Sequence, residues 1–240
     1  MNLKPTQRMI LLTSVVSSCL VSVFILVACR SSKADDRIAT SPLNSESAPV
    51  TVSPSKTNEP IVKAYQKYHQ EAIAKGLSSN GLLLVLTVAD QTMVLTQSGN
   101  EVKRYLISTS AYGLGSSKGS NQTPLGLHKV NERIGDGEPE GRRFISREPV
   151  NQIVPADQRR QPKSADMVLS RVLWLSGLED GKNRGGSVDS HSRCIYIHGT
   201  DQEQLLGKPS SHGCIRMSNA DVIDLFRLIK GRETWCWILE

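Results

Sequence analysis

Residues 195–217 read IYIHGTDQEQLLGKPSSHGCIRM, and they hold two histidines, one cysteine, one arginine and three glycines between apolar segments. A cysteine thiol is only a few per cent ionised at neutral pH, so a thiol that attacks carbonyl groups needs a nearby base to take its proton. His198 ends an apolar run and Cys214 follows a glycine. The segment therefore predicts a catalytic pair, with Cys214 as the nucleophile and His198 as the base.

The order of the motif residues carries a family resemblance. H-G-T at residues 198–200, followed by S-H-G-C-I-R-M at residues 211–217, resembles the signature of the L,D-transpeptidase (YkuD-like) catalytic family. The resemblance extends to residues 82–108, to Q-T-P-L-G at residues 122–126 and to residues 173–186, about two thirds of the chain. It departs after the Q-T-P-L-G turn, where Leu127-His128 stands in place of a residue followed by an aromatic. We expect this departure to affect local packing and not the chemistry.

Several site roles are expected around the predicted pair. The resemblance implies that the carbonyl of Gly199 orients the ring of His198. The backbone N–H groups of His212, Gly213 and Cys214 are expected to face the developing oxyanion, where one donor stabilises the transition state by about 3 to 4 kcal/mol. The side chain of His212 has the alternative of a hydrogen bond within the site.

Arg216 is the candidate substrate-binding residue, because a guanidinium group can bind a carboxylate through two parallel hydrogen bonds. The alternative is an ion pair with Asp221 or Asp224. Ser211 and Thr200 are expected to be structural.

Residues 1–28 have the features of an export signal: Lys4 and Arg8 precede a mostly apolar run at residues 9–27. L-V-A-C at residues 26–29 resembles a bacterial lipoprotein motif, which implies that residues 1–28 are removed and Cys29 is lipidated. An uncleaved membrane anchor and ordinary cleavage nearby are the alternatives, since the run approaches the length that spans a bilayer. The expected location is the periplasmic side of the cell envelope, with a lipid anchor in a membrane.

Residues 29–60 are predicted to form a tether. Residues 30–60 contain seven serines and four prolines and show no apolar periodicity, so they cannot bury enough surface to fold. A helix is predicted next, at residues 61–79, with Asn58 as its cap and Gly76 at its end. Its apolar face is expected to hold Ile61, Tyr65, Tyr68 and Ala72.

Residues 80–240 are predicted to form the catalytic domain, which is mainly β with a few helices. Short apolar runs at residues 82–88, 92–97, 102–108, 167–175 and 234–239 are separated by turn residues, a pattern typical of strands. Ser218 and Asp221 form a helix start signal ahead of apolar residues at helical spacing. The resemblance implies an L,D-transpeptidase-like β-sandwich.

Residues 136–166 are polar, with five arginines and few large apolar side chains, and they are predicted to be irregular. Such a segment inside a compact domain is usually functional or mobile. The segment is either a flap over the active-site cleft that binds acidic groups of the substrate or a solvent-exposed loop without such a role.

Two further hypotheses concern the cysteines. Cys194, His198, His212 and Cys214 are suitable zinc ligands by type, but their spacing departs from structural zinc sites, so no metal or cofactor is predicted. Cys194, Tyr196 and His198 are expected on one face of a strand. Cys194 and Cys236 are candidates for a disulfide, because the domain is expected in an oxidising compartment.

The resemblance implies a cell-envelope L,D-transpeptidase acting on peptidoglycan stem peptides. Cys214 would attack the carbonyl of the third residue of a tetrapeptide stem and expel the terminal D-Ala. An amine on another stem or on an envelope protein would then take the acyl group, whereas water would make the enzyme a carboxypeptidase or wall hydrolase. A catalytically silent wall-binding lipoprotein is the alternative from another class. The formal charge of +6 falls to +4 when Lys4 and Arg8 are removed, and no basic stripe interleaved with aromatics predicts nucleic-acid binding.

Overall fold

The computed structural model describes residues 59–161 and 166–240, which belong to one compact unit, Val52–Glu240. The predicted signal peptide, the predicted lipidation site Cys29 and nearly all of the predicted tether lie outside the described residues. No helix within the described ranges combines the length and the apolar character needed to cross a membrane.

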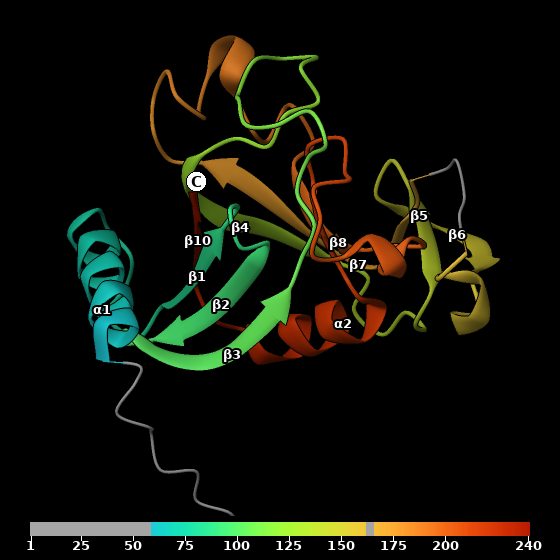
Figure 1. Cartoon of the computed structure of the whole chain (residues 1–240), viewed down its shortest axis with the longest axis horizontal. Helices are drawn as coiled ribbons and strands as arrows, with labels where there is room; N and C mark the ends of the chain where they lie inside the picture. The colour runs from blue at the N-terminus through green and yellow to red at the C-terminus, as the bar shows by residue number, and fades with distance from the viewer. Residues whose placement is uncertain (1–58, 162–165) are drawn as a thin grey trace, which may run out of the picture. The chain divides into compact units, whose positions relative to one another are not determined.

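The described domain is mainly β, as predicted, and its ten strands form one connected sheet (Figure 1). The strands are β1 (Leu82–Thr87), β2 (Thr92–Gln97), β3 (Asn100–Leu106), β4 (Gly126–Ile134), β5 (Arg142–Ile145), β6 (Glu148–Ile153), β7 (Val168–Gly177), β8 (Tyr196–Gly199), β9 (Ile215–Met217) and β10 (Thr234–Leu239). Their order is β3-β2-β1-β10-β4-β7-β5-β6, with β8 beside β7 and β9 beside β8. The pairs β1–β10 and β8–β9 are parallel, and the others are antiparallel.

Strand β1 is apolar at five successive positions because both of its faces are covered. On one face, Leu83 and Val85 pack in a cluster with residues of helix α1 (Glu59–Ala74). On the other face, Leu84 and Leu86 belong to the larger cluster, which includes residues of β8, β9 and helix α2 (Asn219–Leu228). The core therefore fills two layers, one on each side of the central strands.

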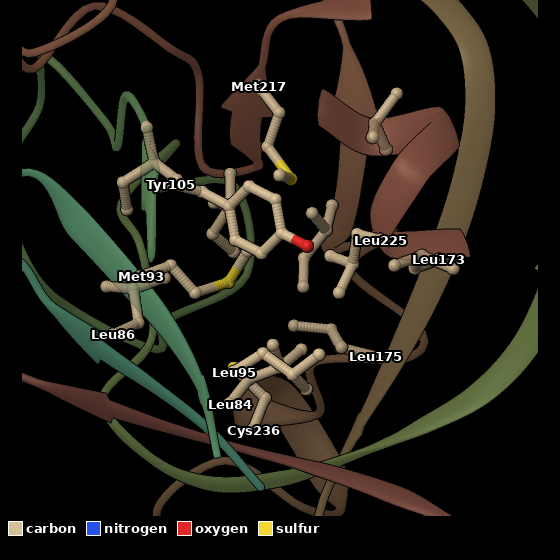
Figure 2. Packing of buried hydrophobic residues seen from close by; sticks show 14 of the residues in the cluster. Leu84, Leu86, Met93, Leu95, Tyr105, Leu173, Leu175, Met217, Leu225 and Cys236 are labelled. Carbon is tan, nitrogen blue, oxygen red and sulfur yellow. The ribbon is translucent and has the colours of Figure 1, made fainter. Parts of the chain in front are cut away.

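The larger cluster joins distant parts of the sheet. Figure 2 shows Tyr105 of β3 between Met93 of β2 and Leu225 of α2, with Met217 of β9 close by. Strands β1 to β3 thus face β8 and β9 across a shared apolar layer, a sandwich-like arrangement made by one continuous sheet.

The helix predicted at residues 61–79 is present with different limits. Helix α1 ends at Ala74, and Gly76 follows with a φ of 114°. The N–H of Leu77 donates to the carbonyl of Ala72 at 3.0 Å, the six-to-one bond of a glycine-terminated helix. The prediction that Gly76 ends the helix is therefore confirmed, whereas the extension to residue 79 is wrong.

The prediction that residues 136–166 are irregular is also wrong in part, because strands β5 and β6 form a hairpin there. All the side chains of β6 are at least partly exposed, so its sequence carries no apolar alternation. Figure 1 shows this hairpin at the opposite end of the domain from α1.

Candidate active site

His198 and Cys214 are held by two neighbouring strands. His198 lies on β8, opposite Val172 of β7 and Arg216 of β9. Cys214 directly precedes β9, and every residue of β8 and β9 is buried. Because β8 is paired on both sides, sheet hydrogen bonds fix the backbone at His198, and Cys214 is held next to the first paired residue of β9.

Gly199 has no room for a side chain. An added Cβ would lie 2.8 Å from the carbonyl oxygen of Leu169 and 2.5 Å from Oδ1 of Asn219. Asn219, the first residue of α2, donates from Nδ2 to the carbonyl of Thr200 at 2.7 Å and accepts from Oγ of Ser170 at 2.6 Å. The start of α2 is therefore fastened to the backbone that follows His198, a link that the sequence does not reveal.

The ring of His198 is almost completely buried, with 2% of the residue exposed. Its Nδ1 lies 2.8 Å from the carbonyl oxygen of Gly199, the contact expected from the sequence. A carbonyl only accepts hydrogen bonds, so Nδ1 carries the proton and Nε2 of the neutral ring is left basic. Burial lowers the pKa of His198 below its ordinary value, and the charge of Asp166 opposes this only in part.

The thiol of Cys214 is partly buried and lies between two backbone groups. Its Sγ accepts from the N–H of Tyr196 at 3.4 Å and donates to the carbonyl of Cys194 at 3.3 Å. Burial raises the pKa of Cys214 to about 12, although the Tyr196 N–H favours the thiolate. The resting pair is therefore a neutral thiol and a neutral imidazole, and reaction requires that a base remove the thiol proton.

The loop before Cys214 depends on Gly213, whose φ is 122°. Oγ of Ser211 accepts from the N–H of Gly213 at 3.2 Å and donates to the carbonyl of Cys214 at 2.6 Å, a structural part of the kind expected for Ser211. The Gly213 N–H is thus already engaged in this state. The Gly213 N–H can donate to an oxyanion, as predicted, only if its hydrogen bond to the Ser211 hydroxyl breaks.

Thr123, from the Q-T-P-L-G turn, is hydrogen-bonded to the same loop. Its Oγ1 donates to the carbonyl of Gly213 at 3.0 Å and accepts from the N–H of Ser110 at 3.0 Å. Sequence reasoning found the turn as part of the family pattern but assigned it no part in the site. The structure brings the two motifs together across 90 residues of chain.

His128, which follows this turn, takes the place of the expected aromatic and is fully buried. Its ring nitrogens lie 3.0 Å from the Gly126 carbonyl and 2.9 Å from Oγ of Ser190. A buried polar ring is thus accommodated because both nitrogens have partners.

Arg216 is 1% exposed, and its guanidinium is paired with Asp166. Its Nη1 also donates to Gln202 and Ser210. The predicted alternatives, Asp221 and Asp224, are wrong partners: Asp221 bonds with the helix-capping Ser218 and Asp224 with Lys103. The predicted contact between Arg216 and a substrate carboxylate stays a prediction, and such a carboxylate would have to displace Asp166.

Asp166 also joins His212 to the site. Its Oδ2 lies 3.2 Å from Nδ1 of His212, whose side chain is 55% exposed. Burial alone would raise the pKa of Asp166, but His198, Arg216 and His212 outweigh burial and lower it. Asp166 was not predicted as a site residue, because a single acid in a polar segment has no distinctive sequence pattern.

The cysteine hypotheses fare differently. Cys194, Cys214 and Cys236 are free thiols, so the proposed Cys194–Cys236 disulfide is wrong. Cys194 precedes β8 with a φ of 57° and does not share its strand face, whereas Cys236 is buried in β10. Within residues 59–161 and 166–240, no three His, Cys, Asp or Glu side chains are grouped as metal ligands are.

Comparison with known proteins shows the family. The family model described as the L,D-transpeptidase catalytic domain (YkuD) matches residues 82–237. A Bacillus subtilis (strain 168) protein named "Putative L,D-transpeptidase YqjB" is 51% identical over 37 residues, which are 15% of this chain and 21% of that protein. Because the family model spans more than half of the sequence, the chain belongs to the L,D-transpeptidase catalytic domain family.

Solved structures are also similar to part of the chain. An L,D-transpeptidase from Mycobacterium smegmatis has 13% identity and a TM-score of 0.38, with 67% of this chain and 59% of that chain covered. A mutant of the Enterococcus faecium L,D-transpeptidase has 14% identity and a TM-score of 0.40, and the match covers 66% of this chain and 50% of that chain. The chain thus spans about a fifth of its curated relative and half to three fifths of these structures.

Proposed function

We propose that this protein is a peptidoglycan L,D-transpeptidase that uses Cys214 as a nucleophile. The observation that carries the proposal is the placement of a buried histidine on β8 and a partly buried thiol directly before the paired strand β9, with Nδ1 of His198 committed to the Gly199 carbonyl. This leaves Nε2 as the basic nitrogen. The family supplies the substrate class, peptidoglycan stem peptides, and no metal or cofactor takes part in the proposed chemistry.

The proposed reaction proceeds in two half-reactions. Nε2 of His198 takes the proton of Cys214 as Sγ bonds to the carbonyl carbon of the third residue of a tetrapeptide stem. The tetrahedral intermediate collapses when the C–N bond to the terminal D-Ala breaks, and the leaving amine receives the proton from His198. An acceptor amine then attacks the thioester, His198 takes its proton, and the Cys214 thiol is restored.

The test is a product assay on labelled muropeptides by mass spectrometry. The wild-type protein is expected to release D-Ala and form a product joined to an acceptor amine, and Cys214→Ala is expected to abolish turnover. Cys236→Ala is the matched control, because it removes a buried thiol from β10 and should leave turnover in place. Normal turnover by Cys214→Ala would refute the mechanism. If water is the only acceptor, the protein is a carboxypeptidase or wall hydrolase. If the wild-type protein binds muropeptides without turnover, it is a silent wall-binding protein.

We also propose that the mature protein begins at a lipidated Cys29, which anchors the domain at the periplasmic side of the envelope. The support is the L-V-A-C motif after an apolar segment at residues 9–27. Intact-mass analysis of membrane-extracted protein should show loss of residues 1–28 and an acyl mass on Cys29. A mass that still includes residues 1–28, or an unmodified Cys29, would refute lipidation.

A further inference from the structure

Arg147 stands at the tip of the β5–β6 hairpin, in an uncommon backbone conformation. Ile145 pairs with Glu148, so Ser146 and Arg147 form a two-residue turn, with φ values of 50° and 74°. Hairpin turns of this kind favour Asn and Gly, and other residues adopt positive φ at a cost. Such strained residues persist where the surroundings hold them, and they concentrate at functional sites.

The guanidinium of Arg147 is held by three groups, two of which belong to residues that contact Cys214. It lies 4.1 Å from the ring centroid of Trp174, and Nη1 donates to the Tyr196 hydroxyl at 3.1 Å and lies 3.9 Å from Sγ of Cys194. Tyr196 and Cys194 are also the two residues whose backbone groups contact Sγ of Cys214. The hairpin tip therefore places a cation against the side chains of two residues whose backbones contact Cys214.

The platform under this cation is rigid. The ring of His191 stacks on Trp174 with centroids 3.7 Å apart and planes 8° from parallel, and Tyr196 meets Trp174 edge to face. Nε1 of Trp174 donates to the carbonyl of His191 at 3.0 Å. A guanidinium stacked on a fixed ring loses little further freedom when it binds a planar anion.

The charge of Arg147 is not balanced by an acid in contact. Within the described residues, no carboxylate oxygen lies within 4.0 Å of its guanidinium, and only Nη1 makes hydrogen bonds. Burial raises the pKa of its partner Tyr196 to about 12, so the hydroxyl is neutral. Arg216, by contrast, is buried and already paired with Asp166. Arg147 is thus a cation that contacts two neighbours of Cys214 and has donors left for an incoming anion.

We propose that Arg147 is a substrate-binding residue that holds a carboxylate of the donor peptide next to the bond that Cys214 attacks. The proposal rests on the proposed function, because it takes the donor to be a stem peptide. Two carboxylates of such a donor have the required chemistry: the C-terminal carboxylate of the leaving residue, and a side-chain carboxylate of the residue whose carbonyl is attacked. Either would accept hydrogen bonds from the unused N–H groups in the plane of the guanidinium.

The test measures donor binding by calorimetry in the Cys214→Ala background, where no turnover occurs. Arg147→Gln should raise the Kd of a donor with free carboxylates by about ten- to a hundredfold, the range expected for a charge-assisted hydrogen bond. Arg147→Lys keeps the charge but lacks the planar fork, and its Kd should fall between the two. Arg143→Gln is the matched control: it removes an equal charge from the same hairpin, where Nη1 of Arg143 donates only to Gln152, and should leave the Kd unchanged.

Amidated donors identify the carboxylate. One donor carries a C-terminal amide and another a side-chain amide, and the donor that lacks the recognised carboxylate should bind equally well to the parent protein and to the Arg147→Gln variant. An equal loss of affinity for acid and amide donors, or no loss at all, would overturn the proposal. A failure of the wild-type protein to release D-Ala would instead refute the proposed function, and this binding measurement would be unaffected.

Discussion

His198 and Cys214 form a pair that is neutral at rest. Many reactive cysteines carry a lowered pKa because a nearby positive charge stabilises the thiolate. Here burial dominates both groups, raising the pKa of Cys214 to about 12 and lowering that of His198. The thiol is therefore expected to react only when a carbonyl group is in place and His198 accepts the proton during the attack.

The pH dependence of the acylation step follows from this arrangement. His198 acts as a base only when neutral, and its pKa is lowered from 6.5, so kcat/KM for D-Ala release should fall only below pH 6.5. Rates measured between pH 4.5 and 9 test this expectation. His198→Ala should lower the rate by about 10² to 10⁴ and remove the acidic limb. An acidic limb centred above pH 6.5 would contradict a lowered pKa for His198.

The site residues that could be predicted from the sequence lie in one continuous motif. The residues that were missed act through contacts with distant parts of the chain. His198, Gly199 and Cys214 stand in a continuous signature, and the His198–Gly199 hydrogen bond joins adjacent residues. Asn219 bonds with Ser170 across 49 positions, and Asp166 reaches Arg216 from before β7. No spacing rule connects such pairs before the strands are placed.

Helix α2 anchors the segment that holds Cys214 in the core. It starts two residues after β9, and Val222, Leu225 and Phe226 bury its inner face. Its start was predictable from sequence because the side chain of Ser218 accepts from the N–H of Asp221, a local bond. The β5–β6 hairpin was not predictable, because its exposed strands lack alternation and its turn is Ser-Arg.

Loss of the α2 cap is expected to destabilise the domain. Ser218→Ala removes the acceptor for the Asp221 N–H, which lies 3.0 Å from Oγ. The free energy of unfolding should fall by about 1 kcal/mol. Urea denaturation followed by tryptophan fluorescence measures this loss. Ser79→Ala is the control, since Ser79 is exposed in the turn before β1, and an equal effect of both variants would contradict a role for the cap.

Across the whole domain, three buried histidines are kept from protonation. Burial lowers the pKa values of His69 and His198, and it lowers that of His128 to about 4. The unfolded chain protonates each of them near pH 6.5, whereas the folded domain does so only at lower pH. Because the unfolded state then binds more protons, the free energy of unfolding must fall as pH decreases through this window.

His128 should account for a defined part of this acid sensitivity. For a shift from 6.5 to about 4, its contribution is about 3 kcal/mol, lost between pH 6.5 and 4 at up to about 1.4 kcal/mol per pH unit. His128→Phe keeps an aromatic ring and removes the titration, so its stability should depend less steeply on pH. Urea denaturation at pH 4 to 7 measures both slopes, and equal slopes would show that His128 is not the group responsible.

The position of β10 in the chain determines when the sheet can be completed during synthesis. Strand β10 follows every other described strand along the chain, yet it lies between β1 and β4 and pairs with both. While the chain is being synthesised, β1 to β3 and β4 to β9 therefore lack the strand that joins them, even though Cys214 has already been made. The two parts of the sheet are thus joined through β10 only when synthesis has passed residue 239.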